Sequence, residues 1–159
     1  MITSKQNSIV KLIRSLSDKK NRDLNGLYIA EGVNTVKEAI KSGRTIDRIV
    51  ATEKGLSRID TLGLEVVVVT DEIFDYITNE VTPQGVMALM IKETVTPQSP
   101  KNCCLFLDEV SDPANVGAII RTAAASGYTE VYLADSADCY SPKSVRASMS
   151  GIFKIKAIQ

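Results

Sequence analysis

Histidine is absent from this 159-residue sequence, and its absence narrows the range of possible functions. Without an imidazole there is no Ser-His-Asp triad, no Cys-His pair and no histidine-ligated metal site. Tryptophan is absent too, which argues against an aromatic cage. The three cysteines, Cys103, Cys104 and Cys139, are an odd number and too few for a disulfide framework, so we expect a reducing, cytoplasmic setting.

Long apolar runs are also lacking. No run approaches the roughly 20 residues of a membrane span, and the N-terminus is basic and polar throughout, so we expect neither a membrane segment nor a signal peptide. There is no Gly-x-Gly-x-x-Gly or Walker-type loop, which counts against a nucleotide-dependent small-molecule enzyme. A composition of 44% hydrophobic and 24% charged residues is typical of a globular protein.

The net charge is zero, but the bases gather at the two ends of the chain. Residues 1–25 hold six bases and two acids, and residues 139–159 hold four bases and no acid. Two basic ends suggest local contacts with a polyanion, although charge runs of this kind are more often ordinary solvated helix faces. The candidate RNA-binding residues are Lys5, Lys11, Arg14, Lys19, Lys20, Arg22, Lys143 and Arg146.

The hydrophobic spacing predicts an α/β fold in the first part of the chain. An amphipathic helix is expected over 4–20, with Ser4 as its cap. The run of four valines at 66–69 predicts a strand buried on both faces of a parallel sheet. The remaining expected elements alternate and predict βαβ units: strands over 27–30, 46–51 and 86–91, and helices over 35–41, 56–62 and 71–79.

Two prolines and polar spacers predict a linker over 95–101, which separates a domain over 1–94 from one over 102–159. Cys103 and Cys104 open an expected buried strand, and Cys139 is expected as a free thiol in a loop. The predicted elements of this second part are strands over 103–107, 130–134 and 153–158, with helices over 115–126 and 142–149 between them.

The segment from Leu107 to Gly127 runs from a strand end into a helix, where open α/β sheets place their ligands. Asn115 is expected at the helix N-terminus, where it can cap free N–H groups or hold a neighbouring loop. Gly117 lies four residues before Arg121, so it would leave room for a phosphate to approach the guanidinium. Either the cap or the arginine alone is more often structural than functional.

Taken together, Asp112-Pro113-x-Asn115-x-Gly117-x-x-x-Arg121-Thr122-Ala123 resembles the first signature motif of the SpoU-type RNA 2′-O-ribose methyltransferases of the SPOUT class. Four further segments agree with that family: 4–7, 28–32, 82–86 and 141–151. The resemblance implies a ribosomal-protein-like, three-layer α/β domain that binds the RNA substrate, followed by an α/β knot domain.

The resemblance also implies an activity: S-adenosylmethionine methylates a ribose 2′-oxygen, in ribosomal RNA in particular, without a metal ion and in a homodimer. Arg121 would hold the adjacent phosphate and stabilise the developing alkoxide, with Asn115 organising the site. The family's later signatures, a glycine-rich segment with a Glu and a Ser-Leu-Asn-type segment, do not occur here. We therefore expect the first βαβαβ part of the knot domain, without its knot or cofactor pocket and inactive alone. A non-catalytic RNA-binding module is the alternative.

Overall fold

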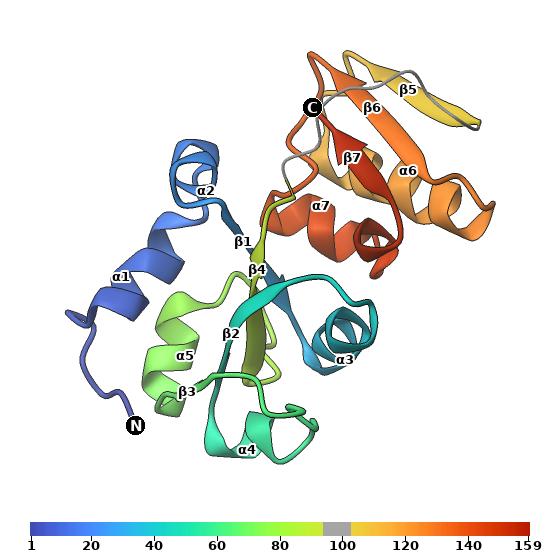
Figure 1. Cartoon of the computed structure of the whole chain (residues 1–159). Helices are drawn as coiled ribbons and strands as arrows, with labels where there is room; N and C mark the ends of the chain where they lie inside the picture. Colours follow the sequence, from blue (N-terminus) through green and yellow to red (C-terminus); the bar gives the residue numbers. More distant parts are fainter. Residues whose placement is uncertain (94–102) are drawn as a thin grey trace. The chain divides into compact units, whose positions relative to one another are not determined.

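A four-stranded mixed sheet and a three-stranded parallel sheet form the framework of the chain (Figure 1). This computed structural model describes residues 1–93 and 103–159, so the linker predicted over 95–101 lies outside the described residues. The chain divides into two units, Met1–Lys92 and Glu93–Gln159. In the described ranges, no helix combines the length and apolarity needed to cross a membrane. The expected α/β class is confirmed.

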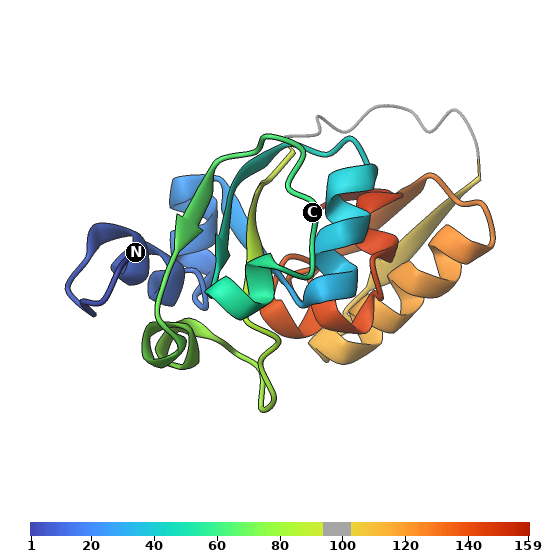
Figure 2. The ribbon, with the colours of Figure 1, turned by 90° about the horizontal axis from the view of Figure 1, so that it is seen from below.

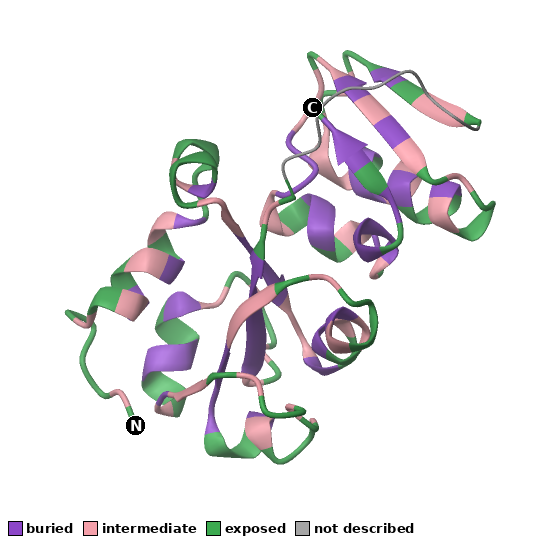
Figure 3. Cartoon of the chain, in the orientation of Figure 1, coloured by how far each residue is buried: buried purple, intermediate pink, exposed green. Residues whose placement is uncertain are grey.

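The first sheet has the order β1 (Leu27–Glu31), β4 (Val86–Ile91), β2 (Ile46–Ala51) and β3 (Val66–Val68). Strand β4 is antiparallel to both of its neighbours, whereas β2 and β3 are parallel. Five of the six residues of β4 are buried, which makes it the centre of the unit (Figure 3). The alternation of strands and helices indicates the α/β class, but it does not reveal the reversed direction of β4.

Helices cover both faces of this sheet (Figures 1 and 2). Helices α1 (Ser8–Ser15) and α5 (Asp71–Ile77) pack on one face, and α3 (Val33–Lys41) packs against β1 and β4 on the other. The main core cluster lies on the side of α1 and α5, and it consists of Val10, Ile13, Leu16, Ile29, Val50, Val69, Ile73, Phe74, Ile77, Met87 and Leu89.

The single helix expected over 4–20 is wrong: two helices occupy this region. Helix α1 begins after Asn7, whose side chain accepts a hydrogen bond from the Ile9 N–H at 2.9 Å, and Ser4 lies outside it. A second helix, α2 (Lys19–Asn25), starts at its own cap, Asp18. An acceptor side chain that satisfies free N–H groups favours a helix start, so Asp18 begins a new helix where the apolar spacing alone predicted continuation.

The valine run is another correction. Strand β3 is an edge strand, and all three of its residues are only half-buried. Ile2 lies beside this edge: its N–H donates to the Val68 carbonyl oxygen at 2.8 Å, and its own carbonyl oxygen accepts from the Thr70 N–H at 3.2 Å. The N-terminal residues therefore cover part of the open edge, which limits pairing with other chains. The short helix expected over 56–62 is instead α4 (Glu53–Leu56).

The second sheet is parallel, in the order β5 (Cys104–Asp108), β6 (Glu130–Ala134) and β7 (Lys156–Ile158). Helix α6 (Pro113–Ala125) packs against α7 (Pro142–Ala147) and a 3₁₀ turn, η1 (Gly151–Phe153). Because that turn occupies residues 151–153, the last strand starts at Lys156 rather than at Phe153.

The cysteine environments differ from expectation. Cys103 is exposed and Cys104 is half-buried, because β5 lies at the edge of the described sheet. Phe106 on the same strand is 67% exposed. Cys139 is a thiol in a loop, as expected, but it is buried. It contributes to packing and is not a reactive surface group.

Candidate functional site

The predicted catalytic helix, α6, is anchored at its start by Asp112. The carboxylate accepts a hydrogen bond from the Ala114 N–H at 2.9 Å, and Pro113 occupies the first turn, where its missing N–H costs nothing. Lys143 of α7 also donates to this carboxylate, at 2.9 Å. The Lys143 ammonium, followed by the Ala114 N–H, lowers the pKa of Asp112. The cap that sequence reasoning assigned to Asn115 is therefore Asp112.

Asn115 is exposed in the first turn of α6. Its side chain forms no hydrogen bond with the residues that the structure describes. Arg121, six residues later, lies about 9 Å further along the helix axis and about 120° around it. The two predicted site residues therefore do not converge on one point of this unit. They reach a common ligand only if that ligand spans more than one face of α6.

The role predicted for Gly117 is wrong. This glycine is buried, and a Cβ placed on it would lie 2.3 Å from the Ser144 carbonyl oxygen and 2.6 Å from the Ala147 Cβ. Real side chains do not tolerate such contacts. Gly117 therefore allows α7 to pack closely on α6, and it leaves no space for a phosphate beside the guanidinium.

Arg121 is exposed, and its guanidinium makes no hydrogen bond or ion pair within residues 1–93 and 103–159. Its backbone, in contrast, is tightly packed. A Cβ placed on Gly151 would lie 3.0 Å from the Arg121 Cα, so the backbone at 151 runs directly against the helix. The two residues before it, Met149 and Ser150, are left-handed, with φ of 46° and 69°. This turn fixes the base of Arg121 and leaves the charged end free for a ligand.

The carboxyl ends of β5 and β6 carry backbone strain. Glu109 follows β5 with φ of 56°, and Asp135 follows β6 with φ of 44°. The two loops are tied together, since the Val110 N–H donates to the Ser136 Oγ at 3.0 Å and the Ala137 N–H donates to the Val110 carbonyl oxygen at 2.8 Å. Non-glycine residues in this conformation cost energy and are often found at functional sites. Sequence reasoning did not identify these positions.

Sequence reasoning also did not identify the structural role of Ser144. It is fully buried, and its Oγ lies 3.0 Å from the Pro113 carbonyl oxygen and 2.8 Å from that of Asp138. It also accepts a hydrogen bond from the Ser141 hydroxyl at 2.9 Å. One hydroxyl thus joins the starts of α6 and α7 to the loop after β6.

The predicted RNA-binding bases of the second unit are both exposed on α7. Lys143 is engaged by Asp112, as described above, and Arg146 stands in the sequence between Ser144 and Ala147, the two residues of α7 that contact Gly117 of α6. Their RNA contacts stay a prediction.

The bases of residues 5–22 fall into distinct groups. Lys5 and Arg14 both approach the half-exposed ring of Tyr76, each at 5.0 Å from its centroid. Lys19 pairs with Asp23 at 2.9 Å, whereas Lys11 and Lys20 are exposed. Lys5 also lies 3.5 Å from Glu72. Cations beside an exposed aromatic ring are compatible with nucleic-acid contact.

Arg22 is the exception, and its prediction as an RNA contact is wrong. It is 3% exposed, and its guanidinium donates to the carbonyl oxygens of Leu16 at 2.7 Å and Ser17 at 2.8 Å. These carbonyls lie at the end of α1 and have no helical partner. Arg22 therefore joins α1 to α2 and is not available to a phosphate.

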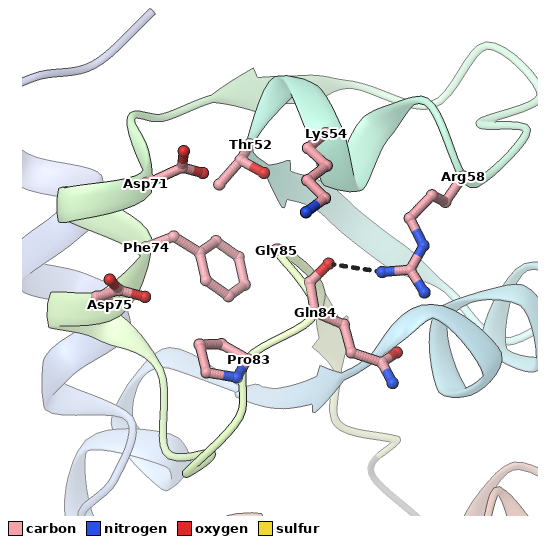
Figure 4. Close-up of a pocket in the computed structure, with 9 residues that line it drawn as sticks. All are labelled: Thr52, Lys54, Arg58, Asp71, Phe74, Asp75, Pro83, Gln84 and Gly85. Atoms are coloured by element: carbon pink, nitrogen blue, oxygen red, sulfur yellow. Dashed lines mark hydrogen bonds between the residues drawn. The ribbon is translucent and has the colours of Figure 1, made fainter.

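Two of the segments that resemble the family, 28–32 and 82–86, meet in the N-terminal unit, where hydrogen bonds fix the loop that precedes β4. The Gln84 side chain accepts a hydrogen bond from the Val33 N–H at 2.8 Å, at the start of α3. The Gly85 carbonyl oxygen accepts from the Thr52 N–H at 2.9 Å, and it would lie only 1.9 Å from a Cβ on Gly55. These contacts form one wall of a pocket in the N-terminal unit, shown in Figure 4.

A second hollow lies on α6 beside β5. It has a volume of about 380 Å³ and is lined by Leu105, Ala118, Ile119, Thr122, Ala123, Ser126 and Tyr128. Its lining offers hydroxyl groups but no carboxylate or amine, and it includes neither Arg121 nor Asn115.

In a comparison with known proteins, each of the two units matches a protein-family model. Residues 7–88 match the MRM3-like substrate binding domain, and residues 102–159 match the SpoU rRNA Methylase family. The 23S rRNA (guanosine(2553)-2'-O)-methyltransferase RlmP of Bacillus subtilis is 31% identical over 99% of this chain and 64% of its own length. An uncharacterized tRNA/rRNA methyltransferase of Synechocystis is 33% identical over 92% of this chain and 57% of its own length.

Among solved structures, the AdoMet-bound rRNA methyltransferase from Sinorhizobium meliloti matches with a TM-score of 0.82 and 32% identity. The match covers 99% of this chain and 63% of that one. The chain thus spans less than two thirds of the length of these relatives.

Proposed function

Since the chain belongs to the SpoU rRNA methylase family and carries an MRM3-like substrate binding domain, we propose that it acts in 2′-O-methylation of RNA, ribosomal RNA in particular. The names of its relatives, rRNA methyltransferases from several organisms, support this proposal. The observation that carries it is the exposed guanidinium of Arg121, which has no partner among the residues that the structure describes and is held at its base by the turn at Gly151. It lies within the residues that match the methylase family.

The chemistry we propose for Arg121 concerns the acceptor side of the reaction. A ribose 2′-hydroxyl is a weak nucleophile that loses its proton as the methyl group arrives. Because the sequence has no histidine, the usual neutral base is missing, and an arginine stays protonated at all ordinary pH values. Arg121 would therefore act electrostatically: its planar donors bind the neighbouring phosphate and stabilise the developing alkoxide. The phosphate would accept the proton, and Asn115 would orient the RNA.

We propose S-adenosylmethionine as the methyl donor. The similar rRNA methyltransferase from Sinorhizobium meliloti, whose structure has AdoMet bound, supports this choice. The hollow on α6 does not fit the charged end of this cofactor. The hollow on α6 offers no charged side chain for its carboxylate or amino group. We therefore propose that the 159-residue chain alone binds RNA but does not bind S-adenosylmethionine. We also propose that the protein acts in the cytoplasm and that the complete enzyme is a homodimer.

A non-catalytic RNA-binding module is the second candidate, and the poor fit to the cofactor favours it for this chain. Two measurements separate the candidates. Calorimetry of the 159-residue chain with S-adenosylmethionine should show no binding at micromolar concentration. The polypeptide encoded by the whole reading frame should then bind the cofactor and methylate RNA. If that polypeptide binds RNA but transfers no methyl group, the module is the correct function.

A further inference from the structure

The pocket in the N-terminal unit brings acidic and basic side chains to opposite walls of one space (Figure 4). Its volume is about 290 Å³. Asp71 and Asp75 line it from α5, whereas Lys54 on α4 and Arg58 just after it line it from the other side. Nothing in the motifs that link the chain to its family involves these four side chains.

These charged groups do not neutralise one another. Lys54, Asp71 and Asp75 make no side-chain hydrogen bond or ion pair within the described parts of the chain. Arg58 makes one long hydrogen bond, at 3.4 Å, to the Gln84 carbonyl oxygen. Other charged residues of this unit do pair across short distances: Lys19 with Asp23, Lys41 with Glu38, and Arg48 with Asp47 and Glu65. Two acids and two bases facing one pocket are suited to a ligand with both donor groups and negative charge.

The floor of the pocket is apolar and preset. Phe74 and Pro83 lie between the acidic and basic walls. The adjoining backbone is fixed because Gly55 has no side chain to separate it from the Gly85 carbonyl oxygen, and because Gly85 has φ of 75°. Because this backbone is already held in place, only the exposed charged side chains have to be ordered when a ligand binds.

We propose that this pocket binds a single unstacked guanine nucleotide of the RNA substrate. The carboxylates accept hydrogen bonds from the N1–H and the exocyclic amine of guanine, which lie side by side on the Watson–Crick edge. Lys54 and Arg58 bind the adjoining phosphate, and the apolar floor contacts the base. The volume is at the small end for ligand pockets, as expected of one base.

Other ligands fit less well. Asp71 and Asp75 would repel a simple anion, and Lys54 and Arg58 would repel a simple cation. Uracil offers one N–H donor on its Watson–Crick edge, and adenine and cytosine each offer only an exocyclic amine there. This inference rests on the proposed function, since it assigns a nucleotide subsite to an RNA-binding unit.

The experiment measures binding of the 159-residue chain to single-stranded RNA decamers at a fixed salt concentration. The first decamer is U10, and the second is U10 in which guanosine replaces one central uridine. A third decamer carries adenosine at the same place. We expect the guanosine decamer to bind about tenfold more tightly than U10, the discrimination expected of a well-placed pair of hydrogen bonds. Asp71→Asn/Asp75→Asn should reduce this preference to below about twofold. Lys54→Ala/Arg58→Ala should weaken all three decamers alike and preserve the ratio.

Two control substitutions lie in the same unit but outside the pocket. Glu72→Gln removes a neighbouring carboxylate of α5 that faces Lys5 instead of the pocket, so it should leave the preference unchanged. Lys41→Ala removes an exposed base away from the pocket. Thermal melting of each variant shows that it is folded.

Equal binding of the three decamers by the wild-type chain would overturn the guanine subsite while leaving RNA binding intact. So would a preference that survives Asp71→Asn/Asp75→Asn, or a stronger preference for adenosine. Failure to bind any decamer would overturn both the subsite and the RNA-binding part of the proposed function.

Discussion

Gly117 of α6 lies directly against Ser144 of α7, so closely that a Cβ at position 117 would be 2.3 Å from the Ser144 carbonyl oxygen. The Ser144 hydroxyl in turn lies 3.0 Å from the Pro113 carbonyl oxygen at the start of α6. The glycine and the serine thus act on the same contact from opposite helices. They position the helix that carries Asn115 and Arg121.

Gly117→Ala should therefore destabilise the C-terminal unit. Inserting a methyl group into a packed contact costs about 1–3 kcal/mol, and here the obstacle is backbone, so we expect the upper part of that range. Hydrogen exchange of the α6 and α7 amides measures the loss. Gly127→Ala is the control: nothing lies within 4 Å of a Cβ there, and only the positive φ of 82° opposes it. Equal effects of the two substitutions would contradict the close-packing role.

Arg22→Met should destabilise the N-terminal unit without affecting RNA contacts. The substitution keeps an apolar stem but leaves the buried Leu16 carbonyl oxygen and the partly buried Ser17 carbonyl oxygen without their donor. We expect a loss of roughly 2–3 kcal/mol in the free energy of unfolding, measured by urea denaturation. Lys20→Met, on the exposed face of the same helix, should change it by less than about 0.5 kcal/mol. If Arg22→Met left the protein stable but weakened RNA binding, Arg22 would be an RNA contact after all.

Asp23 should make stability depend on pH in the acid range. A hydrogen bond from Lys92, and then one from Lys19, lowers the pKa of Asp23 from 3.8 to about 2. The folded state therefore favours the charged carboxylate, and the stabilisation is full above about pH 4 and is lost as pH falls through about 2. Because the side chain is 43% exposed, solvent screening keeps the effect below about 1 kcal/mol.

Comparison of Asp23→Asn with the wild type at pH 6 and pH 2 measures this contribution. We expect the difference in unfolding free energy between the two proteins to shrink on acidification. A difference that stays constant or grows would show that the pairing with Lys92 and Lys19 does not stabilise the fold.

RNA binding by the N-terminal bases should depend on salt. If about three of Lys5, Lys11, Arg14 and Lys20 contact phosphate, the logarithm of affinity falls with the logarithm of salt concentration at a slope of about −2 for single strands. Lys11→Ala should make this slope less steep by about 0.7. Filter binding over a range of salt concentrations measures both values. A salt-independent affinity would remove α1 and α2 from the RNA surface.

Local sequence signals predict most of the elements of this chain but not their surroundings. The strands at 46–51, 86–91 and 130–134 match the prediction, because alternating or continuous apolar runs between turn residues specify them. The valines at 66–68 are half-buried because strand order, a long-range property, places β3 at an edge. The same limit applies to Cys139, whose burial depends on distant packing.

The candidate site shows the same division. The exposure of Arg121 on a helix agrees with its motif, but the reason that the spacing suggested for the glycine four residues earlier is wrong. Gly117 faces α7, whose position no local pattern reveals. Arg22 belongs to a cluster of bases in the sequence, which suggested an RNA contact. In the structure it lies between two helices and joins them instead. The pocket formed by Lys54, Arg58, Asp71 and Asp75 joins residues from separate segments, so no single motif could predict it.

Single-turnover methyl transfer by Arg121→Lys, in the polypeptide encoded by the whole reading frame, tests the proposed function most directly. Lysine keeps the charge but loses the planar pair of donors that can bind a phosphate and an alkoxide together. We expect a loss of about 100- to 1000-fold in rate, the usual cost of removing one oxyanion donor, with an unchanged melting temperature because the side chain is exposed. A near-normal rate, or a lowered melting temperature with normal turnover per folded molecule, would contradict the catalytic role of Arg121.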